Sequence, residues 1–498
     1  MKELTVPYIN FIIANFEIII NKSIKCGFNN RAIRYLKALS YIRYKFFLDI
    51  RDVYIEDKIT ILSQQIVKAS FKKNNYEKSI VIVDEINADY IGLMVQYLSA
   101  LITGSYHILY IYEHIEHPSA ARSHLMQLLN GYCKAEVKKI PSKLHGFSKS
   151  QWIYNEICKF GAKKILMNFG EWAIESCVAC TALPEECNKY RINAADHCFW
   201  AGTSCADYTF EFRHYGANLT FKERGLRRDQ IVYNPFYPVM KDVAFGGFPD
   251  EAKDKFIFLS GGAIYKIVDD DNTFFKHCKL ILDRCPNSVI LFAGADMKNT
   301  VISSGIAEFG LQGRFLPLGY RKDILEVFKR CDVYINTYPL GGGLMCQYAA
   351  QCSKPILNYK DRESEECIAQ KKDCSFTSFT EDLFVDEAER LYSDNEYRKK
   401  RGEEMNHAVI SKEEFDIALL SFLNTGKSIY EVRWNDDFVP KNYRIEDAIA
   451  YNNRKLASFY VKLFKLLGFD SILTMPRNVL SLGIYGIKRQ LKKMKNNN

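Results

Sequence analysis

Strand-like and helix-like segments alternate along most of this chain, and this alternation constrains the fold more than any other feature. In the first series, the strand-like runs are SIVIVDE, HILYIYE, KKILMNF and NKYRINA. In the second series, they are KFIFLSGG, SVILFAGA, GRFLPLGY and DVYINTYP. Each strand–helix unit is about thirty residues long, as βα repeats require. Each series therefore predicts one α/β domain with a parallel sheet.

The stretch GGFPDEAKDK, residues 246–255, separates the two series. Glycine, proline and charged residues are typical of a linker between domains. A chain of 498 residues is long enough for two such domains with smaller additions. We expect two Rossmann-like domains that face each other across a cleft. The expected divisions are a helical cap at 1–77, an N-terminal domain at 78–245, a C-terminal domain at 246–400 and a helical region with a basic amphipathic tail at 401–498.

The formal net charge of +9 is concentrated in this tail, where residues 446–498 hold ten basic and three acidic residues. KLASFYVKLFKLLGF and LSLGIYGIKRQLKKMK combine apolar stripes with lysines, which is typical of helices that bind a membrane surface. For residues 455–470, a helix that packs back onto a domain is as good an interpretation as a helix that binds a membrane. For the rest of the tail, membrane binding is favoured. Nucleic acid is not expected as a partner, because the charge is confined to the tail and no recognised motif is present.

Fifteen cysteines are scattered along the chain, and one pair, Cys177 and Cys180, has C-x-x-C spacing. No second pair with the spacing of a zinc finger or ribbon follows, so structural thiols are preferred over a zinc site. The first ten residues lack the basic and apolar regions of a secretory signal. We therefore expect a cytoplasmic protein, with peripheral contact to the inner membrane face through its tail.

The first strand of the second series ends in two glycines and is followed by a lysine, in FLSGGAIYKI. Backbone N–H groups beside an ammonium suit a diphosphate, because the amides bind oxygens and the lysine neutralises charge. The spacing differs from that of a Walker loop. A simple turn with a surface lysine is the alternative. The residues concerned are Gly261, Gly262 and Lys266.

A second loop of this series, in NTYPLGGGLM, places three glycines between a strand-like run and a helix-like segment. A helix N-terminus offers unpaired N–H groups and a partial positive charge, and glycines let an anion approach closely. Carboxyl ends of parallel strands meet at one sheet edge, so this loop and the Lys266 loop are expected to hold one diphosphate. A flexible turn is the alternative. The glycines are Gly341, Gly342 and Gly343.

Two further residue pairs follow predicted strands. Tyr320 and Arg321 stand at the edge of the second sheet, where they are candidates to flank a nucleotide base, with a solvated helix start as the alternative. Asp196 and His197 follow a strand-like run of the first series. A histidine beside a carboxylate in such a loop is a candidate general base or anion contact, although a lone histidine is more often structural.

Taken together, SGGAIYK, LGYRKDI and DVYINTYPLGGGLMCQYAAQCSKPIL resemble the GT-B glycosyltransferases. More narrowly, they resemble the branch that contains the O-GlcNAc transferases and the bacterial cytoplasmic adhesin glucosyltransferases. Lys266 resembles the lysine that contacts the nucleotide diphosphate in that branch. Asp332, Pro339, Pro355 and the three glycines match its strand–loop–helix pattern, and ADHCFWAG is similar to a stretch of bacterial relatives. The resemblance covers roughly residues 78 to 400. It implies an acceptor-side domain at 78–245 and a nucleotide-sugar-binding domain at 246–400.

This resemblance implies transfer of a hexosyl or N-acetylhexosaminyl group from a nucleoside-diphosphate sugar, with a UDP-sugar favoured. The acceptor would be a glycan, a lipid-linked saccharide or a protein, as in bacterial polysaccharide biosynthesis, and no metal or other cofactor is required. No E-x7-E follows the glycines, which argues against the common retaining class and mildly for inversion. A nucleotide-sugar epimerase of the same fold and a non-catalytic sugar-nucleotide-binding subunit are the alternatives.

The same resemblance implies roles for single residues. Lys266 and the glycine amides would stabilise the departing diphosphate. His197 is the first choice for the catalytic base or an acceptor contact. The other acceptor-side candidates are Asp84, Glu85, Glu171 and Asp196. Gln347 falls near an acidic position of the family pattern, which predicts a contact to the ribose.

Overall fold

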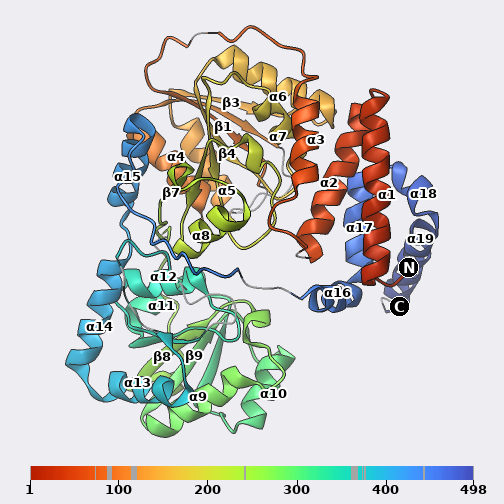
Figure 1. The fold of residues 1–498 in the computed structure, drawn as a ribbon. Coiled ribbons are helices and arrows are strands. Elements are labelled where there is room, and N and C mark those ends of the chain that lie inside the picture. The colour runs from red at the N-terminus through yellow and green to blue at the C-terminus, as the bar shows by residue number, and fades with distance from the viewer. Residues whose placement is uncertain are drawn as a thin grey trace.

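Two α/β domains and one helical bundle make up the computed structural model, with the N-terminal domain above the C-terminal domain in Figure 1. The helices of the two chain ends form the bundle, which lies against the N-terminal domain. The backbone, but not the side chains, is described for 120–121 and 487–496. The residues that the structure describes are 2–46, 48–72, 74–86, 92–113, 120–239, 243–360, 368–372, 374, 377–440 and 444–496.

The N-terminal domain is built on a seven-stranded sheet, within the described part of the chain, in which all neighbouring strands are parallel. Its strand order is β3-β2-β1-β4-β5-β6-β7, so the order reverses between β1 and β4. The strands are β1 (Ser79–Asp84), β2 (His107–Tyr112), β3 (Ala135–Lys139), β4 (Lys164–Asn168), β5 (Asn188–Ile192), β6 (Tyr208–Glu211) and β7 (Ile231–Tyr233).

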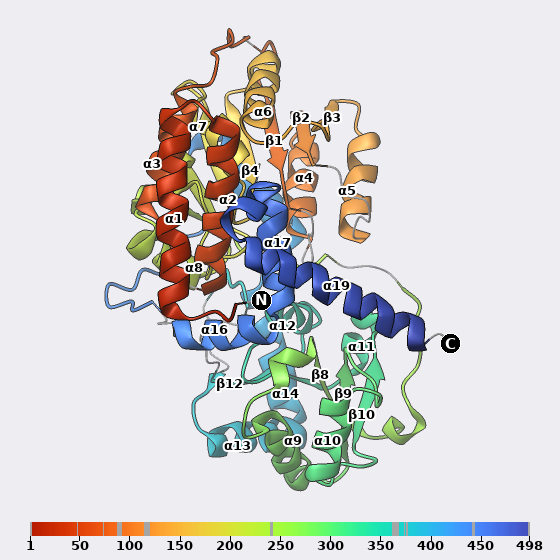
Figure 2. The same cartoon turned by 90° about the vertical axis from the view of Figure 1, so that its right-hand side faces the viewer.

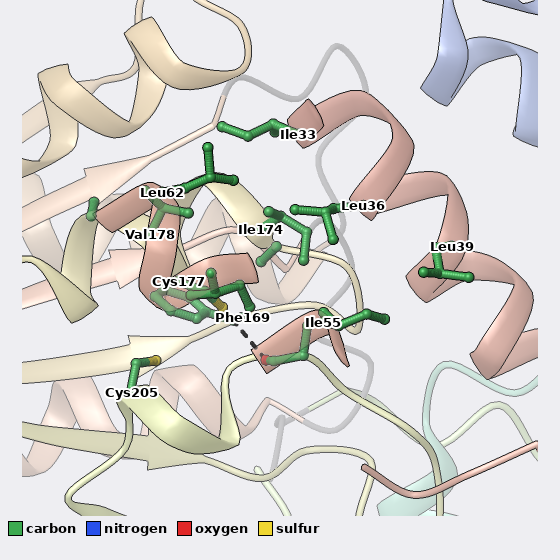
Figure 3. Close-up of a cluster of buried hydrophobic side chains, with 14 of the residues drawn as sticks. Ile33, Leu36, Leu39, Ile55, Leu62, Phe169, Ile174, Cys177, Val178 and Cys205 are labelled. Carbon is green, nitrogen blue, oxygen red and sulfur yellow. Dashed lines mark hydrogen bonds between the residues drawn. The ribbon is translucent and has the colours of Figure 1, made fainter. Parts of the chain in front are cut away.

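Both faces of this sheet are covered, because alternate side chains of each strand enter different apolar clusters. Val81 and Val83 of β1 pack toward α6 and α7, whereas Ile80 and Ile82 pack toward α4 and α15. Figure 3 shows side chains of α2 and α3 meeting those of α7 in the first of these clusters. The helices are α4 (Leu93–Thr103), α5 (Ala120–Asn130), α6 (Phe147–Phe160), α7 (Ile174–Thr181) and α8 (His214–Glu223).

The C-terminal domain repeats this design with a six-stranded parallel sheet among the described residues, in the order β10-β9-β8-β11-β12-β13. Here the order reverses between β8 and β11. The strands are β8 (Phe256–Gly261), β9 (Ser288–Ala293), β10 (Phe315–Gly319), β11 (Val333–Ile335), β12 (Ile356–Tyr359) and β13 (Thr377–Ser378). The helices are α9 (Thr273–Arg284), α10 (Thr300–Glu308), α11 (Ile324–Arg330), α12 (Gly343–Gln351), α13 (Glu381–Ser393) and α14 (Asn395–Ala408).

The chain passes between the domains twice. It leaves β7 at Tyr233 and enters β8 at Phe256, so the predicted boundary lies between these strands. The predicted boundary at residue 400 falls inside α14, whose Met405 is buried in the core of the C-terminal domain. After α14, the helix α15 (Lys412–Thr425) packs back on α4 of the N-terminal domain.

The predicted helical cap is present, but the two ends of the chain build it together. Phe459, Leu463 and Leu467 of α17 are buried in the same cluster as α2, so the packing alternative is the right one for this helix. None of the helices in the described ranges is both long and apolar enough to cross a membrane. The bundle helices are α1 (Val6–Lys25), α2 (Asn29–Phe46), α3 (Val53–Ser63), α16 (Ile445–Arg454), α17 (Leu456–Leu467), α18 (Asp470–Thr474) and α19 (Pro476–Asn496).

Candidate active site

The point where the strand order of the C-terminal sheet reverses lies between β8 and β11. Ligands of open α/β sheets bind outside the carboxyl ends of the strands at such a point. The loop that follows β8 contains Lys266, and the loop that follows β11 contains the three glycines. The topology therefore brings the two predicted phosphate-binding loops to the place where this kind of sheet binds ligands.

Direct contacts join these two loops. The Nζ of Lys266 donates a hydrogen bond to the carbonyl oxygen of Gly341 at 2.7 Å. The backbone N–H of Leu340 donates to the carbonyl oxygen of Lys266 at 3.3 Å. Lys266 lies in the short helix η4 (Ile264–Ile267), and its side chain is half-buried. The ammonium is thus held against the glycine loop, and its contact to a phosphate stays a prediction.

The glycine loop is shaped by Asn336, a buried residue that sequence reasoning missed. Its Oδ1 accepts hydrogen bonds from the N–H groups of Thr337 at 3.0 Å and Gly342 at 2.8 Å. Gly342 then serves as the N-cap of α12, with no capping side chain. Because the Gly342 amide is used within the loop, the donors for an anion are those of the first turn of α12, which begins at Gly343.

Glycines after β8 and β9 allow a close approach of two loops. A Cβ on Gly261 would lie 2.4 Å from the carbonyl oxygen of Ala293. A Cβ on Gly294, whose φ is +131°, would lie 2.3 Å from the carbonyl oxygen of Gly262. Gly261 and Gly294 therefore let these segments pack backbone against backbone, and the predicted Gly262 supplies the carbonyl oxygen that Gly294 approaches. Gly294 was missed in the sequence, where a glycine directly after the strand SVILFA was the available signal.

The two candidates for contact with a nucleotide base differ in their surroundings. The Tyr320 side chain is 84% exposed at the end of β10, so its ring is accessible to a ligand. The Arg321 guanidinium is engaged, since it donates to Asp323 at 2.7 Å and to the carbonyl oxygen of Gly247 at 2.8 Å. Arg321 therefore ties the interdomain linker to the C-terminal domain, and this role competes with the predicted nucleotide contact.

Gln347 does not lie where the sequence predicted. It is buried, and its Nε2 donates to the carbonyl oxygens of Phe236 at 3.0 Å and Ala369 at 3.1 Å. Its Oε1 accepts from the Ala369 N–H at 3.1 Å. Because both N–H donors are used, none is left for a ribose. The side chain instead connects α12 to the segment that follows β7, and Leu344 of the same helix packs into an apolar cluster of the N-terminal domain.

Asp84 ends β1, at the point where the strand order of the N-terminal sheet reverses. Its buried carboxylate accepts from Asn168 at 2.9 Å and from the Ile86 N–H at 3.1 Å, and it also contacts Tyr110 and Arg122. Burial raises the pKa of Asp84, although Arg122 opposes the shift. With both oxygens engaged inside the protein, Asp84 is placed to support the sheet edge rather than to take a proton from a substrate.

Glu85 is the next residue and is also enclosed. Its Oε1 accepts from Ser176 at 2.6 Å and pairs with Lys149 at 2.8 Å. Burial lowers the pKa of Lys149, but Glu85 and neighbouring carboxylates outweigh burial and raise it. Glu171 is half-buried in the loop after β4, and its carbonyl oxygen accepts from the Ala201 N–H at 3.0 Å. The carboxylates of Asp84 and Glu85 are engaged in ion pairs, whereas the contact described for Glu171 uses its backbone carbonyl and not its carboxylate.

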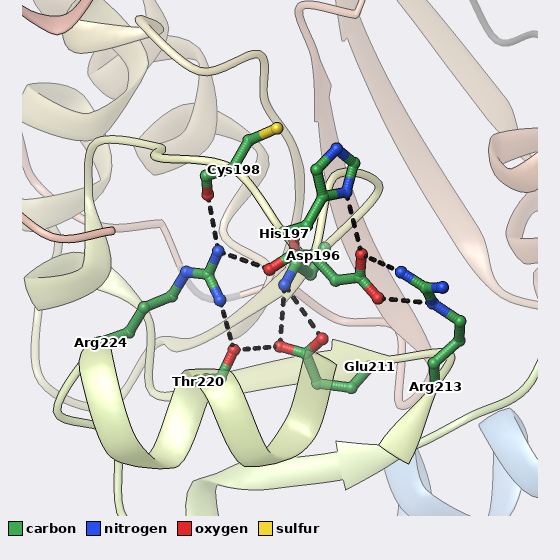
Figure 4. Close-up of polar contacts among 8 residues, drawn as sticks. Asp196, His197, Cys198, Glu211, Arg213, Thr220 and Arg224 are labelled. Atoms are coloured by element: carbon green, nitrogen blue, oxygen red, sulfur yellow. Dashed lines mark hydrogen bonds and ion pairs between the residues drawn. The ribbon is translucent and has the colours of Figure 1, made fainter. Parts of the chain in front are cut away.

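Asp196 and His197 lie in the loop between β5 and β6, as Figure 4 shows. Asp196 is buried and accepts two hydrogen bonds from the Arg213 guanidinium, both at 2.8 Å. The Nδ1 of His197 lies 3.3 Å from the Asp196 carboxylate. Burial opposes ionisation of Asp196, but Arg213 and His197 hold the pKa of its carboxyl well below its usual range.

The charge of Asp196 acts on His197. Burial lowers the pKa of His197, but contact with Asp196 and Cys198 outweighs burial and raises the pKa to about 10. The imidazole is therefore protonated at neutral pH. An imidazolium suits contact with an anionic group better than acceptance of a proton, so the geometry favours the anion-contact role among those predicted.

A buried network holds this loop in place (Figure 4). Arg224 donates to the carbonyl oxygens of Asp196 at 2.8 Å and Cys198 at 2.7 Å. It also donates to Thr220 at 2.9 Å, and Thr220 donates to Glu211 at 2.6 Å. Burial raises the pKa of Glu211 to about 7. Arg213, Arg224 and Glu211 were not among the sequence candidates, because nothing in their local pattern indicates that they converge on one loop.

The C-x-x-C pair lies in the apolar core. Cys177 and Cys180 are both buried on α7, in the cluster that this helix shares with α2 and α3. Among the residues that the structure describes, no group of three or more histidines, cysteines and carboxylates is arranged to hold a metal ion.

Solved structures with a similar fold identify the architecture. A mutant of the O-GlcNAc transferase of Thermobaculum terrenum is 14% identical, with 82% of each chain covered and a TM-score of 0.50. The chain has the GT-B fold. The resemblance predicted from the loop motifs is thereby confirmed at the level of the fold, and the two reversal points described above are those of the two GT-B domains.

Two further structures are similar at greater distance. HepE of Anabaena, in complex with UDP, is 12% identical over 70% of this chain and 98% of its own, with a TM-score of 0.49. The UDP-GlcNAc 2-epimerase of Neisseria meningitidis, bound to UDP-GlcNAc, is 10% identical over 70% of this chain and 100% of its own, with a TM-score of 0.45. No family model and no curated protein sequence matches the chain.

Proposed function

We propose that this GT-B protein transfers a sugar from a nucleoside-diphosphate sugar, preferably a UDP-sugar, to a glycan, lipid-linked saccharide or protein acceptor. The observation that carries the proposal is the contact between Lys266 and the Gly341 carbonyl at the reversal point of the C-terminal sheet. It puts an ammonium beside the uncapped N-terminus of α12. Together these groups suit a diphosphate better than an uncharged ligand.

The transfer is a single displacement at the anomeric carbon. An acceptor hydroxyl forms the new bond, and the bond between the sugar and the β-phosphate breaks, so the nucleoside diphosphate leaves with the electron pair. Lys266 and the first-turn amides of α12 stabilise the charge that develops on the leaving oxygen. In this proposal, Lys266 and the amides stabilise the leaving group without a metal ion. A single displacement also inverts the configuration at the anomeric carbon.

A base on the acceptor side takes the proton of the attacking hydroxyl. We assign this role first to Glu171, because the carboxylates of Asp84 and Glu85 are held in ion pairs with Arg122 and Lys149. His197, held as an imidazolium by Asp196, then contacts an anionic group of the donor or acceptor. The hydrogen bond from Ala201 to the Glu171 carbonyl links the two loops, which supports a shared site.

The setting of the reaction is also proposed. The chain is placed in the bacterial cytoplasm, in polysaccharide biosynthesis, and at the inner membrane face through its C-terminal helices. Support for contact with the membrane comes from the basic residues of the tail, which suit an anionic surface.

The test is a thermal-shift screen of UDP, GDP, ADP and their sugars, followed by product analysis without an acceptor. Stabilisation by a UDP-sugar with slow release of UDP and free sugar supports a transferase. Conversion of the sugar to an isomer supports the epimerase, and binding without turnover supports a binding subunit. The absence of stabilisation by every nucleotide at millimolar concentration refutes all three, because each requires donor binding.

A further inference from the structure

Large apolar side chains are exposed on the last two helices of the chain. Phe469, which precedes α18, is 90% exposed, Leu473 of α18 is 74% exposed and Leu480 of α19 is 68% exposed. Residues four apart share one side of a helix, and Leu480 and Ile484 have this spacing. The remaining exposed apolar residues of this segment are Ile472, Ile484 and Tyr485.

These helices are held firmly by their other side. The buried Asp470 forms ion pairs with Arg34 at 2.7 Å and Arg31 at 3.3 Å, both on α2. The buried Asn478 accepts from the backbone N–H of Lys2 at 2.8 Å and donates to Tyr8 at 3.0 Å. The buried polar residues thus attach α18 and α19 to the bundle, and the exposed apolar residues lie outside these contacts. Figures 1 and 2 show α19 on the outer side of the bundle.

The charge of this segment is strongly positive. Between residues 470 and 496 the sequence holds six lysines and arginines and one acidic residue, Asp470, which is already paired with α2. In the sequence, Ile487, Leu491 and Met494 continue the three- and four-residue spacing that begins at Leu480. Apolar and basic residues thus occur together along one helix.

We infer that α18 and α19 form a docking surface for an anionic lipid bilayer. A bilayer interface accepts apolar side chains, and its negative headgroups attract lysine and arginine, so both features of the surface are matched at once. A second copy of the chain is the poorer occupant, because a symmetric interface places the same basic residues against one another. The inference rests on the membrane placement in the proposed function and names the surface responsible.

The attachment of this surface determines which substrate it serves. α19 packs against α17, and α17 packs against α2. Lys462 of α17 places its Nζ 5.0 Å from the centre of the Trp172 ring, directly after Glu171 in the loop that follows β4. The docking surface is therefore joined to the acceptor side of the N-terminal domain. An acceptor carried on a membrane lipid is presented to that side.

The test is pelleting of the full chain with phosphatidylcholine vesicles that contain or lack phosphatidylglycerol. The parent is expected to bind the anionic vesicles and not the neutral ones. The double variant Leu473→Glu with Leu480→Glu should bind at least about tenfold more weakly, since two apolar side chains are replaced by charges. Ile417→Glu on α15 is the matched control, because Ile417 is also an apolar helix residue with 60% exposure, and its binding should match the parent.

Three results overturn the inference. In the first, the parent binds both kinds of vesicle equally. In the second, the parent and the double variant bind anionic vesicles equally. In the third, the double substitution converts a dimer to a monomer and leaves vesicle binding unchanged. The comparison of vesicles needs no variant, so it stands even where the double variant fails to fold. Stabilisation by UDP, measured on parent and double variant alike, reports on the donor site and separates failure of the docking surface from failure of the proposed function.

Discussion

Lys266→Ala is expected to weaken UDP-sugar binding and slow its turnover while leaving the fold intact. The half-buried side chain donates to the Gly341 carbonyl at 2.7 Å and so connects the loops after β8 and β11. Loss of one such hydrogen bond costs about 1.5 kcal/mol of unfolding free energy, the low end for a charged donor because the side chain is partly exposed. Because the pairing of β8 with β11 also joins these two segments, the variant should melt cooperatively at a temperature close to that of the parent.

The effect on catalysis should be larger than the effect on stability. Lys266 and the N-terminus of α12 are the groups proposed to meet the charge of the departing diphosphate. Removal of one preorganised contact to a developing negative charge costs about 3 kcal/mol in the activation barrier. This corresponds to a loss of roughly a hundredfold in kcat/KM. Binding of UDP itself should weaken too, because the product carries the same diphosphate.

The affinity for UDP is measured by calorimetry, and turnover is measured as release of UDP from a UDP-sugar. Lys276→Ala is the control, since Lys276 is an exposed lysine of the same domain that pairs with Glu381 at 2.8 Å on α13. The control should match the parent in both assays. The reasoning is refuted if Lys266→Ala keeps both affinity and turnover within about twofold of the parent while the parent is active.

Three further substitutions test other parts of the structure. His197→Gln should lower the melting temperature most below about pH 6.5, the pKa of histidine in the unfolded chain. Below that pH the raised pKa of folded His197 contributes its full amount to the free energy of unfolding of the parent. Because the pKa of folded His197 is about 10, the difference from the parent should shrink as the pH rises toward that value, and a constant difference would contradict it. Gln347→Leu removes three hydrogen bonds between α12 and neighbouring backbone, so it should cost about 2–3 kcal/mol in denaturant unfolding and leave UDP affinity nearly unchanged. A large loss of affinity would instead favour the predicted ribose contact. Asn336→Ala releases the Gly342 amide, and UDP affinity by calorimetry should fall about tenfold, whereas an unchanged affinity would mean that the loop shape is unimportant.

Much of the architecture was predictable because parallel strands are apolar on both faces and end in polar or glycine-rich loops. SIVIVDE and DVYINTYP carry this pattern and form β1 and β11. The edge strand β3, with the sequence AEVKK, carries no such pattern, since most of its side chains are partly or fully exposed. The packing of α17 on α2 was also left open, because an apolar stripe shows that a partner exists without showing which partner it is.

The candidate site divides in the same way. The meeting of Lys266 with the glycine loop was predictable, because both loops leave adjacent strands at the same sheet edge. The surroundings of Gln347 and Arg321 were not. Gln347 lies within α12 and Arg321 lies in the loop before α11, but Gln347 contacts the segment that follows β7 and Arg321 contacts the linker. Contacts between segments that are distant in the sequence leave no local pattern to read.

His197 shows why a residue can be found in the sequence while its role stays open. The neighbouring Asp196 is visible in the sequence, and alone it is compatible with a general base or with an anion contact. Arg213, which precedes the next helix, keeps Asp196 ionised, and this carboxylate together with Cys198 outweighs burial and raises the pKa of His197 to about 10. An imidazole must be neutral to take a proton from the substrate hydroxyl, whereas it must already be charged to attract an anion. The arrangement of these three residues therefore favours electrostatic contact by His197, and for this reason the proposed mechanism assigns the proton to a carboxylate such as Glu171.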